Sequence, residues 1–251
     1  MTALQAVCFD VDYTILRPGD CFQAAGYKAV AREHGLTISE SRWREAELAA
    51  WAAVRLRREE MGERHDPHLI DAVGRAVLST LCGGGEQPPG ALDAAVAQVA
   101  ASWYDLDNFS LYYDAKPCLE AVHEMGLTSA LISNTERDLV ALVAHFSLGD
   151  LVDVTLASRE VGLFKPAAGV FAEALERLGV PAAASVMVGD SLHDDIDGAV
   201  ACGFAAAVHL DRPRGRLPDA ERRPPEHALT IHRLSELPPL LETIAEGRSP
   251  S

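Results

Sequence analysis

The chain has 251 residues, 48% of them hydrophobic, which is enough to bury a substantial core in one large domain or in a core with an inserted module. Its 37 acidic residues exceed its 22 lysines and arginines and give a formal net charge of −15 at pH 7. Broad binding to nucleic acids or anionic membranes needs a basic face, so neither is expected as a partner. Five scattered cysteines without CxxC spacing, and no recognisable signal peptide or transmembrane run, favour a cytoplasmic protein.

The first predicted strand covers residues 4–10 and leads into Asp10-Val11-Asp12-Tyr13-Thr14. A short apolar run bounded by polar residues is typical of an interior strand of a parallel sheet, and ligands of such sheets bind beyond the carboxyl ends of the strands. Because Val11 separates the two carboxylates, one can attack a substrate while the other transfers protons. The motif favours nucleophilic catalysis with acid/base assistance. A strand ending in solvated acids that cap the next helix is the competing interpretation.

A long insertion follows this strand, because residues 15–132 separate it from the next polar strand end, whereas the later motifs are one helix-and-strand unit apart. Apolar residues within the insertion recur at helical spacing. Glycine and proline residues between positions 83 and 90 separate two of these stretches. We therefore expect a small helical bundle, with helices near residues 20–35, 39–61, 66–82 and 90–104.

The rest of the chain alternates apolar runs with amphipathic stretches, which is the βα pattern of a parallel sheet. Strands are expected near residues 127–133, 152–157, 185–189, 205–210 and 228–231. Helices are expected near residues 116–125, 136–147, 167–178, 194–202 and 235–245. The predicted fold class is α/β, with a core of residues 1–16 and 111–246 and an inserted α-helical cap of residues 17–110. The segment from Arg212 to Pro225 is expected to be a surface loop, and the tail of residues 247–251 to be disordered.

Two later segments place polar side chains at a strand end or a helix start. Ser133 and Asn134 follow a predicted strand, although this pair alone is common turn and helix-cap chemistry. Lys165 precedes Pro166, which suits the first turn of a helix, and a lone lysine at such a place is usually a solvated charge. Each segment is a weak indication of function by itself.

A third segment is rich in acids, since the strand of residues 185–189 leads into Asp190, and Asp194 and Asp195 follow in the next helical turn. Together with the two acids after the first strand, these carboxylates would repel one another without a cation. Mg²⁺ is the simplest such cation, because it is hard, prefers oxygen and binds one or two carboxylates beside several waters.

Taken in order, Asp-x-Asp-x-Thr at residues 10–14, Ser133, Lys165-Pro166 and Gly-Asp-x-x-x-x-Asp at residues 189–195 resemble the four motifs of the haloacid dehalogenase-like (HAD) hydrolase superfamily. Any one of these motifs is common, but four in this order are specific, and the resemblance covers nearly the whole chain. It implies a Rossmann-like parallel sheet with the α-helical cap that one HAD class carries after the first motif. The implied activity is Mg²⁺-dependent hydrolysis of a small phosphorylated metabolite through an aspartyl-phosphate.

The resemblance also implies roles for individual residues. Asp10 is the expected nucleophile, and Asp12 is the expected acid/base that protonates the leaving group and then activates water. Ser133 and Lys165 are expected to hold the phosphoryl oxygens. The residues expected to contact the substrate are Thr14, Ser133, Asn134 and Lys165.

The expected metal site combines acids from both ends of the motif series. The family spacing in this subgroup selects Asp195 to support the metal site or the lysine, whereas the spacing of other subgroups would select its neighbour Asp194. The expected ligands of Mg²⁺ are Asp10, Asp190, Asp195 and the main-chain carbonyl of Asp12.

The chain departs from the family pattern at two places. Tyr13 stands where these proteins most often have glycine, so the loop carries a bulky ring near the expected substrate entrance. Ala167 and Ala168 follow Lys165-Pro166 where many relatives have Asp-Pro, and we assign that change no functional meaning.

Other functions fit parts of the same pattern. A 2-haloacid dehalogenase shares the nucleophile but needs neither Mg²⁺ nor an acid two residues on, so Asp12 argues against it. A sugar-phosphate mutase keeps all four motifs and stays open. A phosphoaspartate signalling module is much shorter and lacks a cap, and a non-catalytic binding protein is the least expected because every motif residue is intact.

The helical insertion carries the one basic cluster of the predicted cap: Arg55, Arg57, Arg58 and Arg64. A solvated helix face is the simpler interpretation of this cluster. The more specific alternative is that the arginines contact a second anionic group of the substrate. Nothing in these helices marks a sugar, a nucleotide or an acid phosphate, so a small phosphorylated metabolite is the finest substrate class expected.

Overall fold

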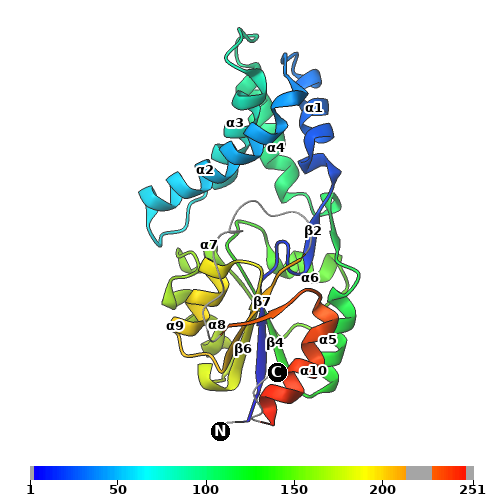
Figure 1. Ribbon diagram of the computed structural model, residues 1–251, viewed down its shortest axis with the longest axis vertical. Coiled ribbons are helices and arrows are strands. Elements are labelled where there is room, and N and C mark those ends of the chain that lie inside the picture. Colours follow the sequence, from blue (N-terminus) through cyan, green and yellow to red (C-terminus); the bar gives the residue numbers. More distant parts are fainter. Residues whose placement is uncertain (1–2, 213–227, 247–251) are drawn as a thin grey trace. The chain divides into compact units, whose positions relative to one another are not determined.

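The computed structural model describes residues 3–212 and 228–246. The chain divides into two compact units, Met1–Arg17 with Leu111–Ser251 and Pro18–Ser110, each with its own apolar core. The first unit combines strands and helices, and the second is largely helical (Figure 1). The predicted disordered tail of residues 247–251 lies outside the described residues, as does the predicted surface loop beyond Arg212.

A six-stranded, fully parallel sheet forms the centre of the α/β unit. Its strands are β1 (Ala6–Phe9), β4 (Thr128–Ser133), β5 (Val154–Ala157), β6 (Ser185–Gly189), β7 (Ala206–Leu210) and β8 (Ala228–Ile231). They lie in the order β5-β4-β1-β6-β7-β8, and Phe9 of β1 is aligned with Leu131 of β4 and with Val188 of β6. The predicted α/β class with a parallel sheet is confirmed, and every strand lies inside its predicted range.

Helices cover both faces of this sheet, which explains why consecutive residues of the central strands β1, β4 and β6 are buried (Figure 1). The helices are α5 (Ala115–Glu124), α6 (Leu139–His145), α7 (Ser158–Val161), α8 (Ala168–Leu178), α9 (Gly198–Ala201) and α10 (Leu237–Ala245). Cys8 of β1 packs in one cluster with Phe171 of α8 and Ala199 of α9, whereas α5 and α10 pack together on the other face. A π-helical turn, η5 (Leu192–Asp197), leads into α9 and begins the predicted helix earlier than expected.

The helical unit consists of four main helices, and each lies inside a predicted range. They are α1 (Ala24–Glu33), α2 (Trp43–Met61), α3 (Leu69–Cys82) and α4 (Ala91–Tyr104). Its core contains Tyr27 of α1, Leu78 of α3 and Val96 of α4. Helix α3 ends at Gly83, whose φ of 67° lies in the left-handed region that glycine adopts at the end of a helix without steric cost.

Two short strands, β2 (Leu16–Pro18) and β3 (Phe109–Leu111), pair where the chain passes between the two units. The N–H of Gly19 donates to the carbonyl of Asn108 at 2.8 Å, and the N–H of Tyr112 donates to the carbonyl of Ile15 at 2.9 Å. The sequence did not predict this ribbon, because three-residue strands are too short to produce a recognisable alternation.

Candidate active site

Three polar residues meet at the carboxyl edge of the sheet, because β1 lies between β4 and β6. Asp10 directly follows β1, Ser133 ends β4 and Asp190 directly follows β6, and all three are buried. The N–H of Asp10 donates to the carbonyl of Val188 at 2.9 Å, which extends the pairing of β1 with β6 up to the site. Strands β4 and β5 lie on one side of β1 and the later strands lie on the other side, and open α/β sheets bind ligands at the point where the strand order switches in this way.

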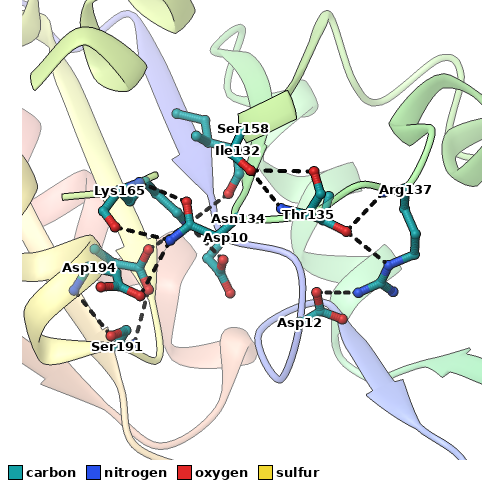
Figure 2. Close-up of polar contacts among 11 residues, drawn as sticks. Asp10, Asp12, Ile132, Asn134, Thr135, Arg137, Ser158, Lys165, Ser191 and Asp194 are labelled. Carbon is teal, nitrogen blue, oxygen red and sulfur yellow. Dashed lines mark hydrogen bonds and ion pairs between the residues drawn. The ribbon is translucent and has the colours of Figure 1, made fainter. Parts of the chain in front are cut away.

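Lys165 supplies a buried cation to this edge. Its Nζ donates to Asp10 Oδ1 at 2.7 Å and to the carbonyl of Ile132 at 2.8 Å (Figure 2). It also donates to Asp195 Oδ1 at 2.6 Å. An ammonium has three N–H donors, so its hydrogen-bonding capacity is filled. Burial alone would lower the pKa of Lys165, but the charges of Asp10 and Asp195 outweigh burial and raise it. The lysine is therefore a fixed cation between two carboxylates.

Asn134 holds the main chain of this lysine. Its Oδ1 accepts from the N–H of Lys165 at 2.7 Å, and its Nδ2 donates to the carbonyl of Lys165 at 3.0 Å (Figure 2). Both ends of the amide are thus used to orient Lys165. The resemblance to the family predicts that Asn134 contacts the substrate. That contact stays a prediction, and the structure adds the contact with the lysine main chain.

A cluster of carboxylates lies beside Lys165. Asp10, Asp190 and Asp195 each bring an oxygen within 4.8 Å of the other two. Asp195 Oδ2 accepts from the N–H of Ser191 at 3.0 Å, and only glycine fits at position 189, because a Cβ there would lie 2.2 Å from this oxygen. Asp194 is outside the cluster and directs Oδ2 toward Asn134 at 3.5 Å.

The cluster fits a hard divalent cation. Burial raises the pKa of Asp195 to about 7, with Lys165 opposing the rise. Three buried carboxylates carry more negative charge than one lysine offsets, and a set of oxygen donors is what Mg²⁺ prefers. Asp10, Asp190 and Asp195 are the side chains that would hold the ion. The contribution expected from the main-chain carbonyl of Asp12 stays a prediction.

Asp12 lies in a different environment from Asp10. Its Oδ2 accepts a hydrogen bond from Nη2 of Arg137, whose side chain is 2% exposed, and in Figure 2 its carboxylate is directed toward this arginine rather than toward Lys165. Burial raises the pKa of the Asp12 carboxyl, and the positive charge of Arg137 opposes that rise. Arg137 was not predicted from the sequence as a residue of the site. Its position just after Ser133-Asn134-Thr135 was the available indication, but a single arginine in a loop is usually exposed.

The loop that carries Asp12 turns sharply. Tyr13 has a φ of 63°, in the left-handed region that favours glycine, which accounts for the glycine that relatives most often have there. Thr14 is fully buried, and its carbonyl accepts from Arg212 at 2.9 Å, while the same guanidinium donates to both carboxylate oxygens of Asp114. The contact of Thr14 with a substrate stays a prediction.

Comparison with known proteins agrees with this geometry. The family model of the haloacid dehalogenase-like hydrolases matches residues 4–203, which contain all four motifs. The chain belongs to this family. The resemblance seen in the sequence is confirmed, and the chain is an enzyme of the hydrolase class.

Curated relatives of this HAD hydrolase include phosphatases. A ribulose-1,5-bisphosphate 5-phosphatase of Halopiger xanaduensis is 34% identical over 206 residues, covering 81% of this chain and 83% of the relative. A glyceraldehyde 3-phosphate phosphatase of Methanopyrus kandleri is 30% identical over 232 residues, covering 88% of each chain.

Among solved structures, a 2-haloacid dehalogenase from Pseudomonas syringae pv. Tomato DC3000 is 27% identical with a TM-score of 0.58, covering 95% of this chain and 98% of that one. The relatives of this chain thus include proteins named as phosphatases and a protein named as a dehalogenase. Across the residues that the structure describes, no helix has both the length and the apolar character needed to span a bilayer.

Proposed function

We propose that this HAD hydrolase is a Mg²⁺-dependent phosphatase that acts on a small phosphorylated metabolite through an aspartyl-phosphate on Asp10. The observation that carries the proposal is the difference between two acids of one loop, because Asp10 is paired with Lys165 and Asp12 with Arg137. Neighbouring carboxylates in different environments can take different catalytic duties. Both phosphatase relatives are named for phosphates of short-chain sugars, so such esters are the first substrates to test.

The proposed reaction has two steps. In the first, an oxygen of Asp10 attacks phosphorus, the bond from phosphorus to the leaving oxygen breaks, and Asp12 gives its proton to that oxygen. In the second step, water attacks the phosphorus of the aspartyl-phosphate while Asp12 takes a proton from this water. The acyl phosphate bond breaks, inorganic phosphate leaves and Asp10 returns as a carboxylate. A raised pKa suits Asp12 to carry the proton at the start.

The surrounding residues would position and stabilise the phosphoryl group. Phosphoryl transfer is catalysed mainly by alignment and by opposite charge near the equatorial oxygens. Lys165, fixed by Asn134, would orient the Asp10 carboxylate and offset negative charge, and Ser133 would donate its hydroxyl to a phosphoryl oxygen. Bound Mg²⁺ would neutralise further charge on the phosphoryl oxygens.

Dehalogenation is the second candidate, because a structural relative is a 2-haloacid dehalogenase. Asp12 argues against it for this chain. A departing halide needs no proton, so a second acid with its own buried arginine would have no task in that reaction. A mutase would use the same residues and differ in returning the phosphoryl group to its substrate.

The test is phosphate release from p-nitrophenyl phosphate and from a panel of sugar phosphates, with Mg²⁺ or with EDTA. We expect EDTA to abolish release and Asp10→Asn to lower turnover by at least about 1000-fold with an unchanged circular dichroism spectrum. Asp150→Asn, the same change at an exposed position, is the matched control and should keep wild-type rates. Full activity in EDTA, or in a folded Asp10→Asn, would refute the proposal. Halide release from a 2-haloacid would favour the dehalogenase, and phosphoryl transfer without release would favour the mutase.

A further inference from the structure

A buried ion pair joins the loop after β1 to the loop after β4. Arg137 and Asp12 form this pair although they are 125 positions apart in the sequence. A guanidinium that is almost completely removed from water is strongly destabilising unless a partner holds it in good geometry. The pair is therefore a fixed part of the site and differs from a solvated surface contact.

Arg137 is itself anchored by the residues around it. Thr135 Oγ1 accepts from the Nε of Arg137 at 3.3 Å and from its main-chain N–H at 3.0 Å. The N–H of Thr135 donates to Ser158 Oγ at 2.9 Å, which ties this loop to the start of α7 (Figure 2). Helix α6 does not depend on the arginine, because Asp138 caps its first turn. The guanidinium is therefore held between Asp12 and the loop that carries Thr135.

This arrangement makes the two oxygens of Asp12 different. Oδ2 accepts from Arg137, whereas Oδ1 is buried and has no hydrogen-bond partner among residues 3–212 and 228–246. Each carboxylate oxygen has two lone-pair sites, and the fixed donor already fills one of the sites on Oδ2. Oδ1 has both sites open to a ligand and is therefore the better placed oxygen for proton exchange.

We infer that Arg137 is a positioning residue for Asp12, which fixes Oδ2 and presents Oδ1 as the oxygen that gives a proton to the leaving group and later takes one from water. The inference rests on the proposed function, since it requires Asp12 to be the acid/base. Lysine would be a poor replacement, because its ammonium lacks the planar, preorganised donors of a guanidinium. The loop that ends β4 would thus hold the phosphoryl group through Ser133 and orient the acid through Arg137.

The test compares two esters that differ in their need for a leaving-group proton. Alkyl oxygen, as in glycerol 1-phosphate, leaves only when protonated, whereas the oxygen of 2,4-dinitrophenyl phosphate leaves without a proton. The value of kcat/KM covers the steps up to departure of the leaving group. Arg137→Gln should therefore lower kcat/KM about 100-fold for the alkyl ester and less than about threefold for the dinitrophenyl ester. Arg159→Gln, at an exposed arginine of α7, is the matched control and should keep both values.

A double-mutant cycle completes the test. In an Asp12→Asn background, Arg137→Gln should change kcat/KM for the alkyl ester by less than about twofold, because its effect passes through Asp12. Equal losses for the two esters, or an undiminished loss on Asp12→Asn, would overturn the inference. If Arg137→Gln does not fold by circular dichroism, Thr135→Val replaces it, since valine removes the acceptor of Arg137 Nε and the same two criteria apply. Wild-type turnover and its loss in Asp10→Asn decide the proposed function separately.

Discussion

Replacing Lys165 with methionine would leave two buried carboxylates without their cation. Lys165 Nζ lies 2.7 Å from Asp10 Oδ1 and 2.6 Å from Asp195 Oδ1, and both carboxylates are almost fully buried. Removing one partner of such a buried pair costs about 3–5 kcal/mol, because the remaining charge cannot return to water. Methionine fills a similar volume, so this loss is electrostatic. Domains are typically stable by about 5–15 kcal/mol, so the variant should fold but be strongly weakened.

The measurement is urea unfolding of wild type and Lys165→Met in EDTA and in Mg²⁺. In EDTA the midpoint should fall by more than about 1 M urea, given a slope of about 1–3 kcal/mol per M. Mg²⁺ should stabilise the variant more than wild type, because a divalent ion offsets the carboxylate charge that the lysine no longer offsets. Turnover should be lost in both buffers. Metal affinity and activity would thus change in opposite directions.

Lys116→Met is the matched control for this prediction. Lys116 is half-buried on α5 in the same unit and makes no ion pair within the part of the chain that the structure describes. Its replacement should change stability by no more than about 0.5 kcal/mol. A Lys165→Met variant no weaker than this control, or one that Mg²⁺ stabilises less than wild type, would refute the reasoning.

Three further predictions concern other residues. Tyr13→Gly should change the free energy of unfolding, measured in urea, by less than about 1 kcal/mol. Glycine relieves the strain of the left-handed backbone but loses more conformational entropy on folding, and the two effects offset each other. A loss above about 2 kcal/mol would contradict this prediction. Burial raises the pKa of Cys8 to about 12, so iodoacetamide at pH 8 should label this thiol only when urea has unfolded the protein. The half-buried Cys21 should be labelled in the folded protein. Peptide mass spectrometry distinguishes the two sites of labelling. Hydrogen bonds from Arg57 lower the pKa of Asp66, so this pair stabilises the helical unit above the unfolded pKa and the stabilisation fades as pH falls below about 4. Asp66→Asn should therefore lower the melting temperature at pH 7. If the melting temperature is lowered by the same amount at pH 2.5, the ion pair with Arg57 is not the source of the stabilisation.

The strands and the chemistry at their ends could be predicted from the sequence, because both are encoded locally. A buried strand is rich in apolar residues, and a polar residue that follows the apolar run marks its carboxyl end. Asp10, Ser133 and Asp190 could therefore be placed at one edge of a parallel sheet without coordinates. The helical insertion was also predictable, since its apolar residues repeat with helical spacing over long stretches.

Which charges are buried, and against what, was decided only by the tertiary structure. Asp194 and Asp195 are adjacent in the sequence, and the geometry of the π-helical turn brings Asp195 to Lys165. The sequence around Arg137 predicts an exposed loop arginine, yet its side chain is buried against Asp12. The burial of a charge depends on a partner that neutralises it, and here the partners are far apart in the sequence, so no local pattern encodes the pairing.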